Sequence, residues 1–141
     1  MTRRGFLGAT GAMIAAPTLV SASAARKRTV RFAHFTDIHV QPERQAAKGM
    51  EHALAHMQSL KDKPTFLVTG GDQIMDAFGA SEERTKAQWK IWTEVMKSHC
   101  KIPAVHCIGN HDLWRGEKKE GDNDPLYARR LAMEMLGLER R

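Results

Sequence analysis

Apolar and polar positions follow two different periods along this chain, and each change of period separates an expected strand from an expected helix. Residues Thr29–Phe35 are rich in β-branched and aromatic side chains, which predicts a first strand. From Glu43 to Leu60 the apolar residues recur at helical spacing, and Pro64 ends that pattern. The short apolar run Thr65–Thr69 then predicts a second strand.

The same alternation continues in the second half of the chain. Ser81 followed by two acidic residues is typical of a helix start, because the serine oxygen accepts bonds from free amides and acids favour the positive end of the helix dipole. Pro103 leads into Ala104–Ile108, which predicts a third strand. Asp124-Pro125 predicts the start of a last helix, which Gly137 closes.

Strands that alternate with helices of this length predict parallel strand–helix–strand units, and so an α/β fold. In open sheets of this kind, ligands bind beyond the carboxyl ends of the strands. Residues that carry chemistry are therefore expected directly after the strands.

The first 24 residues have the features of an export leader. Arg3-Arg4 reads as a twin-arginine signal, the stretch Phe6–Val20 is moderately apolar, and Ala22-Ser23-Ala24 fits a cleavage site. We expect cleavage after Ala24, export to the periplasm or the exterior, and a single domain over residues 25–141. The apolar stretch is shorter than the roughly 20 residues of a spanning helix, so stable membrane insertion is not expected. An uncleaved leader is the alternative.

The charge pattern favours an anionic small molecule as partner. The formal net charge is +6, and removal of residues 1–24 takes away two arginines and no acids. The remaining positive charge is spread out and has no run of Lys and Arg interleaved with aromatic residues, so a nucleic-acid partner is not expected.

The two cysteines, Cys100 and Cys107, are expected to be buried free thiols. A strand-like span of seven residues would hold their Cα atoms on the order of 15–20 Å apart, at about 3.3 Å per residue. A disulfide needs less than roughly 7 Å.

Three polar motifs each follow a predicted strand: Asp37-Ile38-His39, Gly70-Gly71-Asp72 and Gly109-Asn110-His111-Asp112. Together they collect carboxylates, an amide oxygen and imidazoles at one sheet edge. Such donors hold Mn, Fe or Zn, and pairs of these ions hydrolyse phosphate esters. A carboxylate beside an imidazole also favours the protonated ring, which can donate to a leaving oxygen.

In this order, the motifs resemble those of the calcineurin-like metallophosphoesterase superfamily, over about residues 29–112. The resemblance implies a four-layer α/β/β/α domain that binds two divalent metal ions and hydrolyses small phosphomonoesters or phosphodiesters with a metal-bridging hydroxide. It also implies that Asp37 and His39 bind the first metal, that Asp72 bridges, and that Asn110 binds the second.

The resemblance further implies that His111 lies near the leaving group as a proton donor or charge stabiliser and that Asp112 orients it. Asp76 follows Asp72 by four residues rather than the more familiar three or so, which leaves its role open.

The family completes its site with three further histidines, whereas no histidine follows His111 in this sequence. We therefore expect the N-terminal βαβαβ portion of the domain, as a fragment or a truncated product. The alternative function is a catalytically inactive fragment or pseudoenzyme with weak metal binding only. A half-domain should leave one sheet face uncovered and self-associate through it.

Other candidate residues have structural interpretations. We expect His52 and His56 on a solvated helix face, since they lie opposite the apolar stripe. The residues expected in the core or in structural roles are His34, His99, His106, Trp89 and Trp92.

Overall fold

The computed structural model describes residues 30–115 and 126–139. Within these ranges strands and helices alternate in the order β1 (Phe32–Phe35), α1 (Ala46–Ser59), β2 (Phe66–Thr69), α2 (Glu82–His99), β3 (Ala104–His106) and α3 (Arg129–Leu136). The predicted leader and the predicted helix start at Asp124-Pro125 lie outside the described residues.

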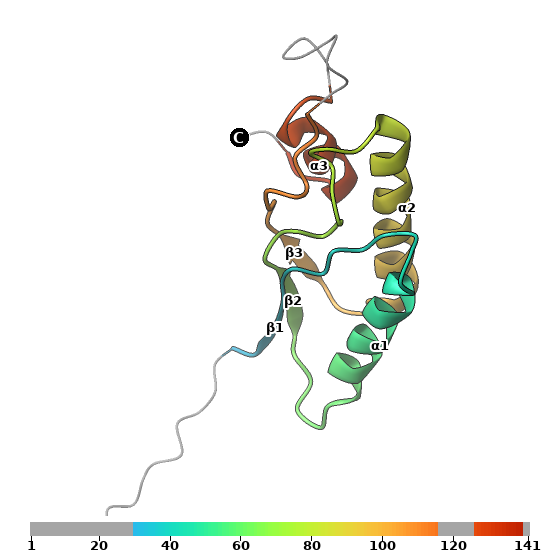
Figure 1. The fold of residues 1–141 in the computed structure, drawn as a ribbon. Helices are drawn as coiled ribbons and strands as arrows, with labels where there is room; N and C mark the ends of the chain where they lie inside the picture. The colour runs from blue at the N-terminus through green and yellow to red at the C-terminus, as the bar shows by residue number, and fades with distance from the viewer. Residues whose placement is uncertain (1–29, 116–125, 140–141) are drawn as a thin grey trace, which may run out of the picture.

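The strands form one parallel sheet in the order β1-β2-β3. Phe32 pairs with Phe66, and Leu67 pairs with Ala104. Each crossover joins neighbouring strands, and α1 and α2 lie on the same side of the sheet (Figure 1). The predicted α/β class and the βαβαβ order are confirmed.

The core lies between the covered face of the sheet and the two long helices. Alternate residues of a strand point to opposite faces, so Leu67 and Thr69 of β2 are both buried on the helix side. Trp89 and Trp92 pack edge to face at 5.8 Å between ring centroids, as expected of core residues. The other buried apolar residues of α1 and α2 are Met50, Leu54, Met57 and Val95.

The opposite face of the sheet is exposed and apolar. Phe32 of β1 is 53% exposed and Val105 of β3 is 57% exposed. Phe32 stacks on Phe66 at 5.5 Å between ring centroids, so an aromatic ladder crosses two strands. His34 is also exposed, so its predicted core position is wrong: it shares strand parity with Phe32 and not with the covered Ala33.

The helix ends differ from the pattern where the backbone departs from helical angles. α1 begins at Ala46 rather than Glu43, because Arg44 and Gln45 adopt φ of 56° and 54°, in the left-handed region. α2 begins as predicted: Ser81 caps it by accepting from the Arg84 amide at 3.2 Å.

The last helix, α3, begins at Arg129. The residue before it, Ala128, forms an antiparallel bridge with Trp114 instead of a helical turn. The predicted closure at Gly137 is confirmed, with φ of 64°.

The two thiols are free, as expected, although only Cys100 is partly buried and Cys107 is exposed. The strand ends at His106, two residues earlier than predicted, and Cys107 follows it on the uncovered side. The exposed positions of His52 and His56 are confirmed.

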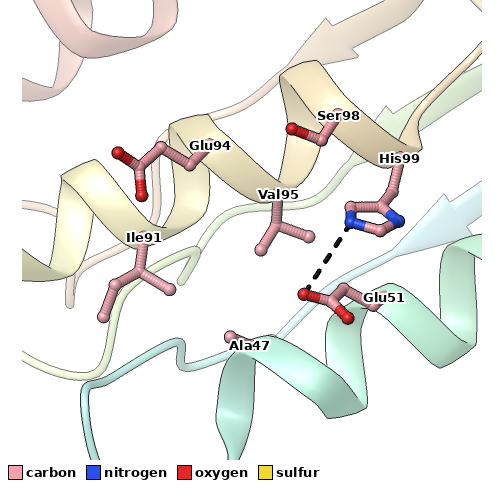
Figure 2. A pocket seen from close by; sticks show the side chains of 7 residues that line it. All are labelled: Ala47, Glu51, Ile91, Glu94, Val95, Ser98 and His99. Atoms are coloured by element: carbon pink, nitrogen blue, oxygen red, sulfur yellow. Dashed lines mark ion pairs between the residues drawn. The ribbon is translucent and has the colours of Figure 1, made fainter.

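A shallow hollow of about 250 Å³ lies between α1 and α2, and Figure 2 shows its lining. Its apolar lining residues include Ile91 and Val95, and its polar lining residues include Glu51, Glu94 and His99. The His99 ring lies 3.8 Å from the Glu51 carboxylate and is exposed, so a core position for His99 is wrong. All lining residues belong to the two helices, so the strand-end motifs do not reach this hollow.

None of the helices in the described ranges combines the length and the apolar composition that crossing a bilayer requires.

We propose that the exposed apolar face makes the purified chain self-associate. Val105→Thr keeps a β-branched side chain of similar shape but adds a hydroxyl to the face, and should lower the mean mass at a given concentration. Size-exclusion chromatography with light scattering over a concentration series measures this. Leu60→Gln, at the end of α1 and outside the face, is the control; an unaltered chain that stays monomeric throughout contradicts the proposal.

Candidate metal centre

The turns that follow β1 and β2 run side by side and are joined by main-chain hydrogen bonds. The Asp37 amide donates to the Gly71 carbonyl at 3.3 Å, and the His39 amide donates to the Asp72 carbonyl at 3.0 Å. Asp37, His39 and Asp72 have φ of 54°, 50° and 52°, half of the non-glycine residues with positive φ in the described ranges. Such angles are rare for L-residues and cluster at functional sites.

The turns after β2 and β3 approach each other so closely that only glycine fits between them. A Cβ on Gly109 would lie 2.1 Å from Asp72 Oδ1 and 2.3 Å from the Asp72 nitrogen. Gly71, with φ of 103°, faces the Gly109 backbone, which a Cβ there would meet at 2.7 Å. The two glycine motifs therefore set the distance between the Asp72 carboxylate and the turn that carries His111.

These turns bring His39, Asp72 and His111 together. One ligand atom from each lies within 4.8 Å of the other two. The two imidazole rings meet edge to face at 4.6 Å between centroids, and the His111 amide donates to Asp72 Oδ1 at 2.9 Å. All three residues are partly buried at the carboxyl ends of the strands.

Two predicted ligands lie at the margin of this cluster. Asp37 is outside it: its side chain is 64% exposed, with Oδ1 at 3.8 Å from His39 Nε2. Asn110 is exposed and precedes His111 in the same turn.

The ring of His111 is held by a main-chain carbonyl. Its Nδ1 bonds to the carbonyl oxygen of Met75, and the Ala77 amide donates back to the His111 carbonyl at 2.8 Å. Because a carbonyl oxygen only accepts, Nδ1 carries the proton and Nε2 is left for a metal, a proton or a substrate atom. Sequence reasoning missed Met75, since its side-chain type carries no signal for a main-chain contact.

Asp112 is fully buried and joins the two turns. One carboxylate oxygen accepts from the amides of Gln73 (2.9 Å) and Ile74 (3.2 Å), and the other accepts from the Gly109 amide at 2.8 Å. Burial raises the pKa of the Asp112 carboxyl, and nearby Asp72 adds to this rise, while the three amides act in the opposite direction. The Asp112 carboxylate was expected to orient the His111 ring, but it bonds main-chain amides instead. The Met75 carbonyl orients the ring in its place.

A second polar network fixes the loop after β2. Asp76 Oδ1 accepts hydrogen bonds from the amides of Phe78 (2.8 Å) and Gly79 (3.0 Å), so the Asp76 carboxylate stabilises a turn. The Asp76 amide donates to the buried Gln88 side chain at 3.1 Å, a contact that the sequence did not indicate.

His106 is structural, as predicted. Its Nδ1 lies 3.0 Å from the Thr69 hydroxyl, its ring packs edge to face on Trp92, and burial lowers its pKa.

The residues of the cluster fit a divalent metal ion. The Nδ1 atom of His39 is buried and has no hydrogen-bond partner among the described residues. An unsatisfied buried polar atom costs about 1–3 kcal/mol, which a bound cation in this cluster would help to offset. Two imidazoles and a carboxylate suit Mn, Fe or Zn.

Comparison with known proteins identifies the family of the chain. The sequence profile of the calcineurin-like phosphoesterase family matches residues 30–137, which include every motif residue of the three turns. The chain therefore belongs to the calcineurin-like phosphoesterase family. A comparison with curated proteins found no match.

Gly109→Ala should destabilise the fold by about 1–3 kcal/mol or more, because the added methyl group meets the Asp72 backbone and cannot be relieved by a rotamer change. Urea unfolding followed by far-UV circular dichroism measures this.

Gly49→Ala is the matched control. Gly49 lies within α1 with nothing within 4 Å of an added Cβ, so alanine should stabilise the fold by about 0.5–1 kcal/mol. Equal effects of the two substitutions would contradict the close approach at Gly109.

Proposed function

We propose that this chain is a metal-dependent phosphoesterase that acts on small phosphomonoesters or phosphodiesters. The observation that carries the proposal is the convergence of His39, Asp72 and His111 to within 4.8 Å at the ends of three parallel strands. Family membership supports the same reaction class.

The proposed ligand set extends from the cluster to its margin. His39 and Asp37 would hold one ion, Asn110 would hold a second, and the Asp72 carboxylate would be shared between them. Bound divalent ions supply a low-pKa water as nucleophile and stabilise charge on the phosphoryl oxygens. The Mn, Fe or Zn identity of the ions follows only from donor chemistry.

In this proposal His111 handles the proton of the leaving group. Its Nδ1 proton is committed to the Met75 carbonyl, so Nε2 is the atom that holds a proton and donates it to the departing oxygen. Asp112 acts one step away: it fixes the turn and so the position of the His111 backbone.

A second candidate is metal binding without hydrolysis, in a catalytically inactive pseudoenzyme. The one cluster of titratable donors found in the described ranges contains His111 itself. If His111 Nε2 is a metal ligand, it cannot also carry the proton, and a single weakly bound ion results. The two candidates therefore assign opposite roles to the same nitrogen.

Asp72→Asn should abolish hydrolysis of bis-p-nitrophenyl phosphate in the presence of Mn²⁺ and weaken Mn²⁺ binding at least tenfold, because it removes the charge that both metal positions share. Titration calorimetry and release of nitrophenolate measure the two effects. Asp62→Asn, in an exposed ion pair with Arg31, is the control that should change neither.

His111→Gln separates the two candidates. Retained Mn²⁺ affinity with hydrolysis reduced about 10²-fold or more supports the proton role. Lost affinity in a chain without hydrolysis supports metal binding alone.

We further propose that the chain is exported by the twin-arginine route and cleaved after Ala24. The basis is the sequence pattern of residues 1–24. Expression of the full chain in a bacterium with this route should give a periplasmic or secreted product whose N-terminal sequence begins at Ala25. Arg3→Lys with Arg4→Lys should retain the product, uncleaved, in the cytoplasm; a product that is exported unchanged contradicts the proposal.

A further inference from the structure

An exposed aromatic residue lies directly beside the turn that carries His111. The loop after β2 is bonded to that turn twice, through the Met75 carbonyl and the Ala77 amide. Phe78 is the next residue, and its amide is fixed by the Asp76 carboxylate at 2.8 Å. The residue is nevertheless 48% exposed, although its main-chain amide is hydrogen-bonded.

A guanidinium group covers the ring of Phe78. The Cζ atom of Arg115 lies 3.5 Å from the ring centroid. Arg115 follows Trp114, which is 1% exposed and whose amide donates to the Ala128 carbonyl at 3.0 Å. Both partners of the stack therefore extend from anchored backbone, and Arg115 lies four residues after His111 in the chain.

A stacked guanidinium is suited to bind an anion. The face of the group contacts the aromatic ring, while the N–H donors around its edge remain in the plane that binds phosphate oxygens in pairs. The stack also limits the rotamers of a long side chain, so less entropy is lost when an anion binds.

We propose that Arg115, held against Phe78, is a phosphate-binding residue beside the metal centre, and that it contacts the non-bridging oxygens of the phosphoester substrate. This inference rests on the proposed function, because it takes the substrate from there. It adds a specificity determinant: Arg115 favours esters with a free anionic phosphate over neutral triesters.

The main experiment measures inorganic phosphate binding to the Mn²⁺-loaded chain by titration calorimetry, with Mn²⁺ affinity measured separately for each variant. Arg115→Gln should weaken phosphate binding about tenfold, through loss of a charge-assisted pair of bonds. Phe78→Leu should weaken phosphate binding about threefold, because the Arg115 guanidinium keeps its charge but loses the aromatic ring that fixes its position. Mn²⁺ affinity should remain within about twofold in both variants, since neither residue offers a ligand to the cluster.

Arg31→Gln is the matched control, because it removes the same charge next to the first residue of β1, at the opposite end of the sheet, where Arg31 pairs with Asp62 at 2.8 Å. Phosphate binding should stay within about twofold in this variant, which accounts for the general effect of net charge. An Arg115→Gln chain that binds phosphate as the unaltered chain does overturns the inference and leaves the proposed function standing.

A chain that binds no Mn²⁺ would refute the proposed function. A second measurement tests the inference in that case, and also if Arg115→Gln does not fold. Phosphate is titrated into the unaltered metal-free chain while the side-chain Nε–H resonances of Arg115 and Arg31 are followed by NMR. A saturable shift of the Arg115 resonance alone supports the phosphate contact. Equal small shifts of both resonances overturn it.

Discussion

The contact on which the site depends is the close approach of the turns after β2 and β3. Asp112, buried between them, accepts hydrogen bonds from three main-chain amides. At Gly109 there is no room for a side chain, because Asp72 lies too close. A buried carboxylate is unfavourable unless donors surround it, so these amides and this carboxylate require one another. The metal-type donors are brought together as a result of this pairing rather than by attraction to one another.

Hydrophobic periodicity predicted the order of the elements well, because the covered sheet face and the apolar stripes of the helices are long enough to give a clear pattern in the sequence. It predicted their ends less well. Arg44 and Gln45 have side chains compatible with a helix, but their backbone is left-handed, and the polar pattern does not encode that angle. His34 was misplaced for a different reason: on a strand whose outer face is apolar too, alternation no longer distinguishes the two sides.

The site was predictable to the extent that it depends on side-chain type. His39, Asp72 and His111 meet as the motif order indicated, because parallel strands end at the same sheet edge. The contacts of Asp112 and Met75 were not predictable, since each joins a side chain to a main-chain group: amides donate to the Asp112 carboxylate, and the Met75 carbonyl accepts from the His111 ring. Adjacency in sequence suggested that Asp112 serves His111, yet consecutive residues of a tight turn point in different directions.

The carbonyl that holds His111 has a consequence for how this chain can vary. The proton on Nδ1 is fixed by the path of the backbone, and any residue at position 75 presents the same carbonyl oxygen. A substitution of Met75 by another apolar residue should therefore leave the tautomer of the His111 imidazole unchanged. The tautomer of the His111 ring depends on the backbone path of the loop after β2. An insertion or deletion between Asp72 and Ala77 would shift the Met75 carbonyl and remove its hydrogen bond to Nδ1.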